Sequence, residues 1–151
     1  MADPFSIYAL VDTTARICVS LYNFFNDVAD APEEIKDLLR QLGEFKTLLP
    51  LVKKYAEGIN NARSSEGNRL AQDALFPMLR ACEADFNAIH AAVKDHSPED
   101  LPTLRRLGKA VSWVLEKDQI EALCERLGTA KINLILALHI SGGCATYLFQ
   151  V

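Results

Sequence analysis

The sequence predicts an all-α fold: a single helical bundle of about five helices, mostly antiparallel, with a largely buried N-terminal helix. Apolar residues recur every three or four positions along nearly every segment, and no stretch shows the alternation typical of a β-strand. Of the 151 residues, 50% are hydrophobic and 24% are charged, which is the balance of one globular domain with one core. Short connections between the helices favour antiparallel neighbours.

The segment 5–28 predicts the first helix. Its polar residues follow one another at intervals of three or four and so form one narrow stripe: Asp12, Arg16, Ser20, Asn23 and Asp27. The apolar remainder forms two further stripes, one with Ile7, Leu10, Thr14, Ile17, Leu21, Phe24 and Val28, the other with Tyr8, Val11, Ala15, Val19 and Tyr22. A helix of this kind needs neighbours on two sides, which predicts a central position in the bundle.

The same segment matches neither a signal peptide nor a membrane span. Asp3 and Pro4 stand where a secretory signal has basic residues, and no small-residue cleavage site follows. Asp12 and Arg16 would each cost about 2.5–3.5 kcal/mol at the centre of a membrane. The four cysteines, at positions 18, 82, 124 and 144, form no CxxC pair. We therefore expect reduced thiols in a cytoplasmic protein.

The second helix is predicted to begin after Asp30, with Pro32 near its first position and two acids, Glu33 and Glu34, facing its dipole. Its apolar residues are Ile35, Leu38, Leu42, Phe45, Leu48, Val52, Tyr55 and Ile59. Pro50 is expected to kink or divide it, and residues 58–67 are expected to form a polar loop or frayed end. The third helix has Ala71, Leu75, Leu79, Cys82, Phe86, Ile89 and Val93 on its buried stripe, with a kink expected at Pro77.

Ser97 and Pro98 predict the start of a fourth helix. Its inward residues are Leu101, Leu104, Leu107, Val111 and Val114. Asp118 and Glu121 resemble a capping box at the head of a fifth helix, whose apolar residues are Ile120, Leu123, Leu127, Leu134 and Leu138. Ser141 and the two glycines that follow should end that helix. Residues 141–151 are then a C-terminal tail or the start of a linker to a downstream domain.

No arrangement of residues predicts an enzyme. The Gly108-Lys109 pair lacks the earlier glycine of a phosphate-binding loop, and Cys124 and His139 would lie about 22 Å apart on one helix. His90 and His139 are expected to be partly buried helix residues rather than metal ligands. We therefore expect no catalytic, cofactor-binding or metal site. The net charge of −4 argues against nucleic-acid binding.

A group of basic residues lies on or near one side of the predicted fourth helix and just beyond it: Arg105, Arg106, Lys109 and Lys117. Each such residue contributes about 1 kcal/mol near an anionic membrane, so the group could recruit the domain but would hardly hold it alone. An ordinary solvated surface is the alternative interpretation.

Four stretches carry a family resemblance: MADPFSI at the start, DVADAPEEIKDLLRQLGEFKTLL after it, LRACEADF in the middle, and WVLEKDQIEALCERLGTAKINLILAL near the end. In this order, over residues 1–140, they resemble the fungal N-terminal domain of STAND and NLR-like proteins, the HeLo-like group. The resemblance implies a helical bundle over residues 1–140 that acts as the effector end of a larger receptor. Nucleotide-binding and repeat modules would follow it in the longer chain.

The resemblance also implies a mechanism. Members of the wider group are linked to innate immunity, heterokaryon incompatibility and regulated cell death, through oligomerisation and membrane attack by the N-terminal helix. The implied partners are other copies of the chain and, on activation, an anionic plasma membrane reached from the cytoplasm. The implied membrane and assembly residues are Phe5, Ile7, Tyr8, Leu10, Val11, Ile17, Val19, Leu21, Tyr22, Phe24 and Phe25. Cytotoxic relatives often carry glycines in this helix, and this one has none, so a non-toxic adaptor domain is the alternative.

Overall fold

The computed structural model describes residues 4–28, 31, 33–61, 66–94 and 117–140. These residues form four helices and no strand: α1 (Pro4–Asn26), α2 (Glu33–Asn61), α3 (Glu66–Val93) and α5 (Lys117–Ile140). The all-α class is therefore confirmed. The expected fourth helix and the tail after Ile140 lie outside the described residues, so the count of about five helices stays a prediction.

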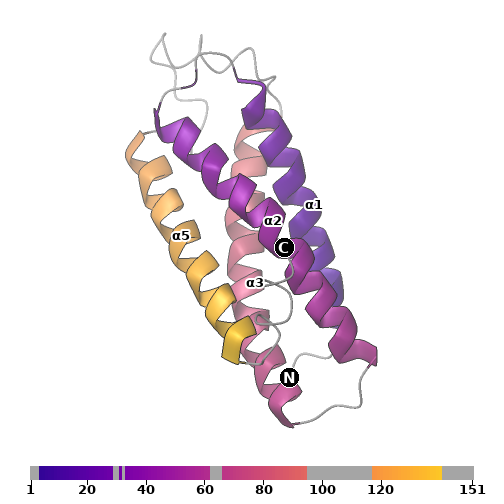
Figure 1. The fold of residues 1–151 in the computed structure, drawn as a ribbon. Coiled ribbons are helices and arrows are strands. Elements are labelled where there is room, and N and C mark those ends of the chain that lie inside the picture. The colour runs from indigo at the N-terminus through magenta and orange to yellow at the C-terminus, as the bar shows by residue number, and fades with distance from the viewer. Residues whose placement is uncertain (1–3, 29–30, 32, 62–65, 95–116, 141–151) are drawn as a thin grey trace.

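The described helices pack as a four-cornered bundle (Figure 1). The helices α1 and α5 each pack against both α2 and α3, which places α1 and α5 at opposite corners. The pairs α1/α2 and α3/α5 are antiparallel, whereas α1/α3 and α2/α5 run in the same direction (Figure 1). The expectation of mostly antiparallel neighbours thus fails for the last two pairs, because the chain passes from α2 to the helix diagonally opposite.

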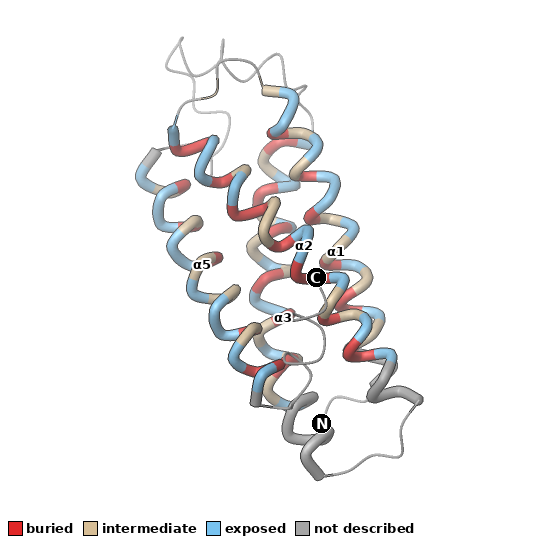
Figure 2. The backbone as a smooth tube through the Cα atoms, in the orientation of Figure 1, coloured by how far each residue is buried: buried red, intermediate tan, exposed pale blue. Residues whose placement is uncertain are grey.

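One hydrophobic core fills the space between the helices, and the buried positions face inward on all four (Figure 2). At its centre the rings of Phe45 and Phe86 meet edge to face, with their centroids 5.4 Å apart. On α2, α3 and α5, every expected apolar position whose side chain is described is buried. The spacing of apolar residues therefore predicted the inward faces of these three helices correctly.

Neither internal proline divides its helix. The helix α2 continues through Pro50 and α3 continues through Pro77, and both prolines are exposed. Proline removes one backbone hydrogen bond and crowds the preceding turn, but on the solvent side water can satisfy the carbonyl that is left. The predicted division at Pro50 is wrong for this reason.

The helix ends differ from the predicted ones by a few residues. The helix α2 extends to Asn61 and α3 begins at Glu66, so most of the expected polar loop at 58–67 is helical. Glu33 and Glu34 lie in the first turn of α2, as predicted. Asp118 is the second residue of α5, so it lies within the first turn and compensates the helix dipole there, rather than capping the helix.

Candidate functional site

Among the four described helices, α1 lies at one corner, against α2 and α3. Its buried residues run along the border between the two predicted apolar stripes: Ile7, Leu10, Val11, Thr14, Cys18, Leu21 and Phe25. Two neighbours, α2 and α3, cover this face. The prediction of neighbours on two sides is confirmed, and the central position stays a prediction, because the expected fourth helix lies outside the described residues.

The structure places the residues assigned to membrane attack in different environments. Ile7, Leu10, Val11, Leu21 and Phe25 are buried; Tyr8, Ile17, Tyr22 and Phe24 are half-buried; Val19 is 37% exposed. The side chain of Phe5 lies outside the described part of the chain, as do those of Arg105, Arg106, Lys109 and Lys117. The proposed contact of these basic residues with anionic lipid therefore stays a prediction.

A polar seam joins α1 to α2. The Asp12 carboxylate accepts a hydrogen bond from Lys53 Nζ at 3.0 Å and pairs with Arg16 Nε at 3.1 Å. The hydrogen bond from Lys53 lowers the pKa of Asp12, and the same bond raises the pKa of Lys53. Asp12 belongs to the predicted solvent stripe, yet it is fixed to the neighbouring helix.

Two lysines of α2 also lie over aromatic rings of α1. Lys53 Nζ is 5.4 Å from the centroid of the Tyr8 ring, and Lys46 Nζ is 4.4 Å from that of Tyr22. Sequence reasoning missed both lysines. They are seven positions apart on α2 and therefore share a face, but only the pairing of α1 with α2 shows what this face meets.

The two helices approach closely at Gly43. A Cβ atom placed there would lie 3.2 Å from Cε2 of Tyr22, so the absence of a side chain lets this ring pack against the backbone of α2. Beside it, Cys18 Sγ donates a hydrogen bond to the carbonyl of Leu42 at 3.3 Å. These contacts hold α1 against α2 along its C-terminal half.

The described cysteines are free thiols, which agrees with the expectation of reduced cysteines, and Cys144 lies outside the described residues. Burial raises the pKa of Cys18 and Cys82 to about 12 and that of Cys124 to about 11. All three are therefore protonated at neutral pH and poor nucleophiles.

His90 and His139 lie in helices, as predicted, but the expected partial burial is wrong, because both are exposed. Both lie in the last turn of their helices, where a basic group faces the negative end of the helix dipole.

Among the described side chains, no three histidine, cysteine, aspartate or glutamate residues come together as metal ligands would. Within the same part of the chain, no helix combines the length and apolar character that crossing a bilayer requires.

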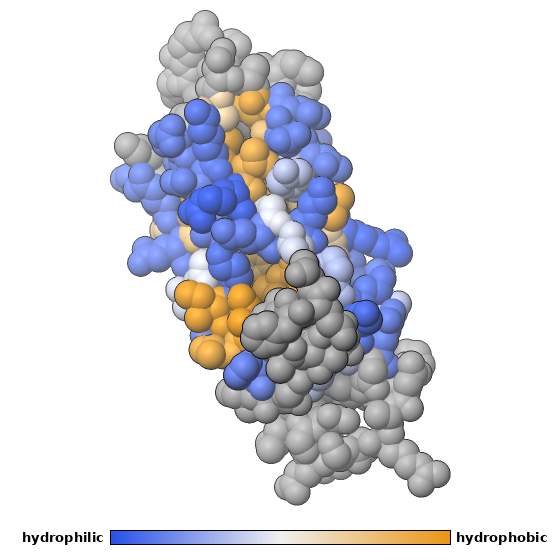
Figure 3. Space-filling model, viewed as in Figure 1, coloured by the Kyte–Doolittle hydropathy of each residue, from blue (hydrophilic) through white to orange (hydrophobic). Residues whose placement is uncertain are grey.

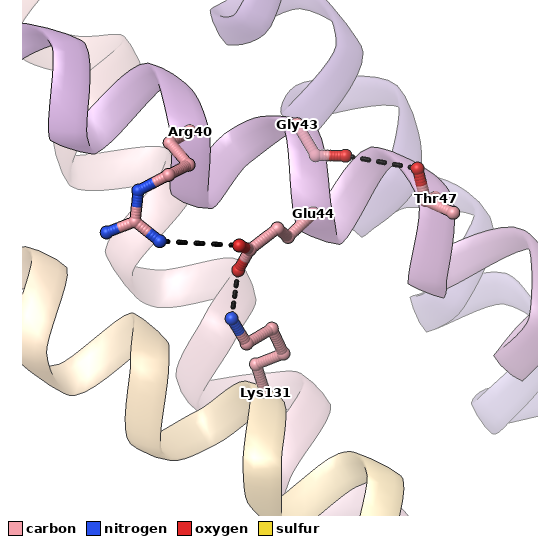
Figure 4. Close-up of polar contacts among 5 residues, drawn as sticks. All are labelled: Arg40, Gly43, Glu44, Thr47 and Lys131. Atoms are coloured by element: carbon pink, nitrogen blue, oxygen red, sulfur yellow. Dashed lines mark hydrogen bonds and ion pairs between the residues drawn. The ribbon is translucent and has the colours of Figure 1, made fainter.

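A second surface feature lies between α2 and α5, and we call it the α2–α5 groove. It has a volume of about 520 Å³ and is lined by Arg40, Gly43, Glu44, Thr47, Leu48, Leu51, Lys131 and Ile135. The Glu44 carboxylate pairs with Arg40 Nη1 at 3.3 Å and also with the Lys131 ammonium, which reaches it from α5 (Figure 4). The Glu44 carboxylate therefore forms ion pairs with two cations.

Beside the groove, α5 carries two exposed apolar side chains one turn apart, which we call the α5 ridge. Ile132 is 57% exposed and Leu136 is 52% exposed. Apolar surface is visible at this end of α5 in Figure 3. The sequence signal was present, because the stretch from Ile132 to Leu138 is apolar on nearly all sides, but the predicted stripe used only Leu134 and Leu138.

Comparison with known proteins adds no family: no protein-family model, curated protein or solved structure matches this chain. The resemblance to HeLo-like domains therefore stays a prediction from the sequence.

Proposed function

We propose that the chain is the N-terminal effector or signalling domain of a fungal NLR-like receptor. In this proposal it acts by oligomerisation, and α1 then moves from its own bundle to a membrane or to neighbouring copies, in regulated cell death or heterokaryon incompatibility. The fourth helix predicted to follow Ser97 and Pro98 would complete the five-helix bundle in this account. The domain resides in the cytoplasm until downstream modules assemble it at the plasma membrane.

The observation that carries this proposal is the construction of α1. Its apolar face is covered by α2 and α3, while Arg16, Ser20 and Asn23 stay in solvent. An amphipathic helix of this kind can exchange one apolar environment for another without exposing its apolar face to water. The same construction supports both a resting state within the bundle and an active state outside it.

The free energy of burial sets the condition for the exchange. Five large apolar side chains of α1 are buried: Ile7, Leu10, Val11, Leu21 and Phe25. At about 1.5–3 kcal/mol each, exposing them costs about 8–15 kcal/mol, which equals the whole stability of a typical domain. A single copy therefore keeps α1 in place. Clustering raises the local concentration of helices, so that contacts between copies or with lipid replace the lost burial.

Leakage of dye from anionic liposomes tests the proposal, with the full chain fused to an inducible clustering module. We expect leakage only after clustering. Val19→Glu should abolish it, because Val19 is exposed in the bundle but belongs to the apolar stripe that would meet lipid. Ser20→Glu, which adds the same charge to the polar stripe, should leak like the parent chain. Absence of leakage from the clustered parent, or equal leakage from both variants, would contradict the proposal.

The second candidate function is a non-toxic helical adaptor that recruits other proteins. The α5 ridge favours it, because two large apolar side chains lie exposed beside a groove and α1 takes no part in that surface. An adaptor would bind its partner with α1 still in the bundle. Clustered chains that cause no leakage but retain the α1 packing would support this function over the first.

A further inference from the structure

The faces of α2 and α3 that receive α1 make several specific contacts with it, and we call them together the α1-binding surface. Lys53 donates a hydrogen bond to the Asp12 carboxylate at 3.0 Å. Lys46 Nζ lies 4.4 Å from the centroid of the Tyr22 ring, and the same ring packs against Gly43. An acid, an aromatic ring and an apolar face must therefore arrive together, at fixed positions along one helix, to satisfy this surface.

The helix α1 is joined to the other described helices through one connection, residues 27–32, between Asn26 and Glu33. Six residues in extended form span about 20 Å, whereas a helix with its side chains is about 10 Å across. The connection is therefore long enough for α1 to lie on the α1-binding surface of an adjoining copy of the chain.

A second copy replaces the contacts of α1 more completely than lipid does. Lipid can cover the apolar face of α1, but it supplies neither the hydrogen bond from Lys53 nor the gap at Gly43 that receives the Tyr22 ring. An identical copy offers the same surface with every one of these groups in place. Reciprocal exchange between two copies therefore keeps all the contacts of α1, and such exchange of an identical element is a low-cost route to a dimer.

We propose that copies brought together in the absence of a membrane exchange α1 reciprocally, so that α1 of each copy lies on the α1-binding surface of the other. The partner is thus a second copy of this chain. The inference rests on the proposed function for the departure of α1 from its own bundle, and it names what receives the helix when no lipid is present. The alternative is a dimer in which each copy keeps its own α1.

A charge exchange at Asp12 and Lys53 tests this inference with the full chain. In Asp12→Lys, and likewise in Lys53→Glu, like charges face each other wherever α1 lies on the α1-binding surface of the same variant. When the two variants are mixed, only reciprocal exchange places opposite charges at both contacts. We expect mixed dimers to outnumber either homodimer by about tenfold, because like charges at such a contact are disfavoured.

Native mass spectrometry counts the species, with one variant isotopically labelled, after the mixture has been unfolded in urea and refolded at high protein concentration. The matched control is Asp27→Lys mixed with Lys54→Glu, which makes the same changes of charge at exposed positions near opposite ends of the antiparallel α1/α2 pair. Its mixed dimers should not exceed the statistical proportion. The double variant Asp12→Lys/Lys53→Glu should have a higher urea midpoint than either single variant, because its charges pair within one copy.

The stability of the mixed dimer separates exchange from simple attraction between oppositely charged chains. A dimer in which each copy keeps its own α1 leaves like charges at both contacts, so only an exchanged dimer should have a urea midpoint, followed by circular dichroism, above those of both single variants. Three results would overturn the inference: no dimers, mixed dimers no more abundant than in the control pair, or a mixed dimer no more stable than the single variants.

The experiment uses no liposomes, so the exchange and the proposed function can fail separately. Leakage from the clustered parent chain without mixed dimers would overturn the exchange alone. Mixed dimers without leakage would leave the exchange in place and contradict the membrane role of α1.

Discussion

Asp12 is the residue through which the solvent stripe of α1 is joined to α2. Its carboxylate lies between Arg16 on its own helix and Lys53 on the next, and it is only 27% exposed. A charged group held in this way contributes to stability through the difference between its pKa in the folded and unfolded chains. The α1–α2 seam should therefore respond to acid.

We expect Asp12→Asn to lower the urea midpoint of unfolding at neutral pH. The hydrogen bond from Lys53 depresses the pKa of Asp12 below 3.8, so its contribution is complete above that pH and is lost as the pH falls through the depressed value. The midpoints of the parent and the variant should accordingly converge in acid. Asp27→Asn is the control, because Asp27 has no ion pair among the described residues. A gap between parent and Asp12→Asn that persists unchanged in acid would contradict this account.

Individual residues also show where prediction from sequence stops. The polar stripe of α1 followed directly from spacing, and Arg16, Ser20, Asn23 and Asp27 are all exposed. The attachment of Asp12 to Lys53 could not be found in the same way, because the two residues lie 41 positions apart and meet only through helix pairing. The exposure of His90 and His139 was not predicted, because hydrophobic periodicity does not show how much of the last turn of a helix faces solvent.

At the scale of helices, α1 should behave as a core element with one outer edge. We expect Leu21→Ala, at a position 1% exposed, to reduce the free energy of unfolding by about 2–5 kcal/mol. Val19→Ala, two residues earlier and 37% exposed, should cost less than about 1 kcal/mol. Urea denaturation followed by circular dichroism measures both. Similar losses in the two variants would mean that α1 does not pack on α2 and α3 through the face described above.

The spacing of apolar residues predicts some features of the helices and leaves others open. Spacing predicted the four described helices, and on α2, α3 and α5 it also predicted the inward residues, since one buried face is required of any helix in a small bundle. The predicted division of α2 at Pro50 was wrong, because α2 continues through this exposed proline, whereas the kinks expected at Pro50 and Pro77 stay predictions. Spacing also missed the α2–α5 groove, because a pattern along one helix does not show which helices are neighbours.

For the whole molecule, the central claim is that α1 closes the bundle in a single copy and leaves it on assembly. Two buried thiols report on this directly. Cys18 on α1 and Cys82 on α3 are both buried, and they lie close enough for their thiols to influence each other. When α1 leaves, Cys82 loses its cover while remaining on the rest of the bundle.

The most direct measurement is the rate at which Cys82 reacts with a thiol reagent, in a full-length chain carrying Cys18→Ser, Cys124→Ser and Cys144→Ser. In the unclustered chain we predict that labelling requires global unfolding and speeds up only with denaturant. After clustering on anionic liposomes, labelling of Cys82 should become fast without denaturant. Leakage that occurs while Cys82 stays as protected as in a single copy, or fast labelling already before clustering, would contradict the account.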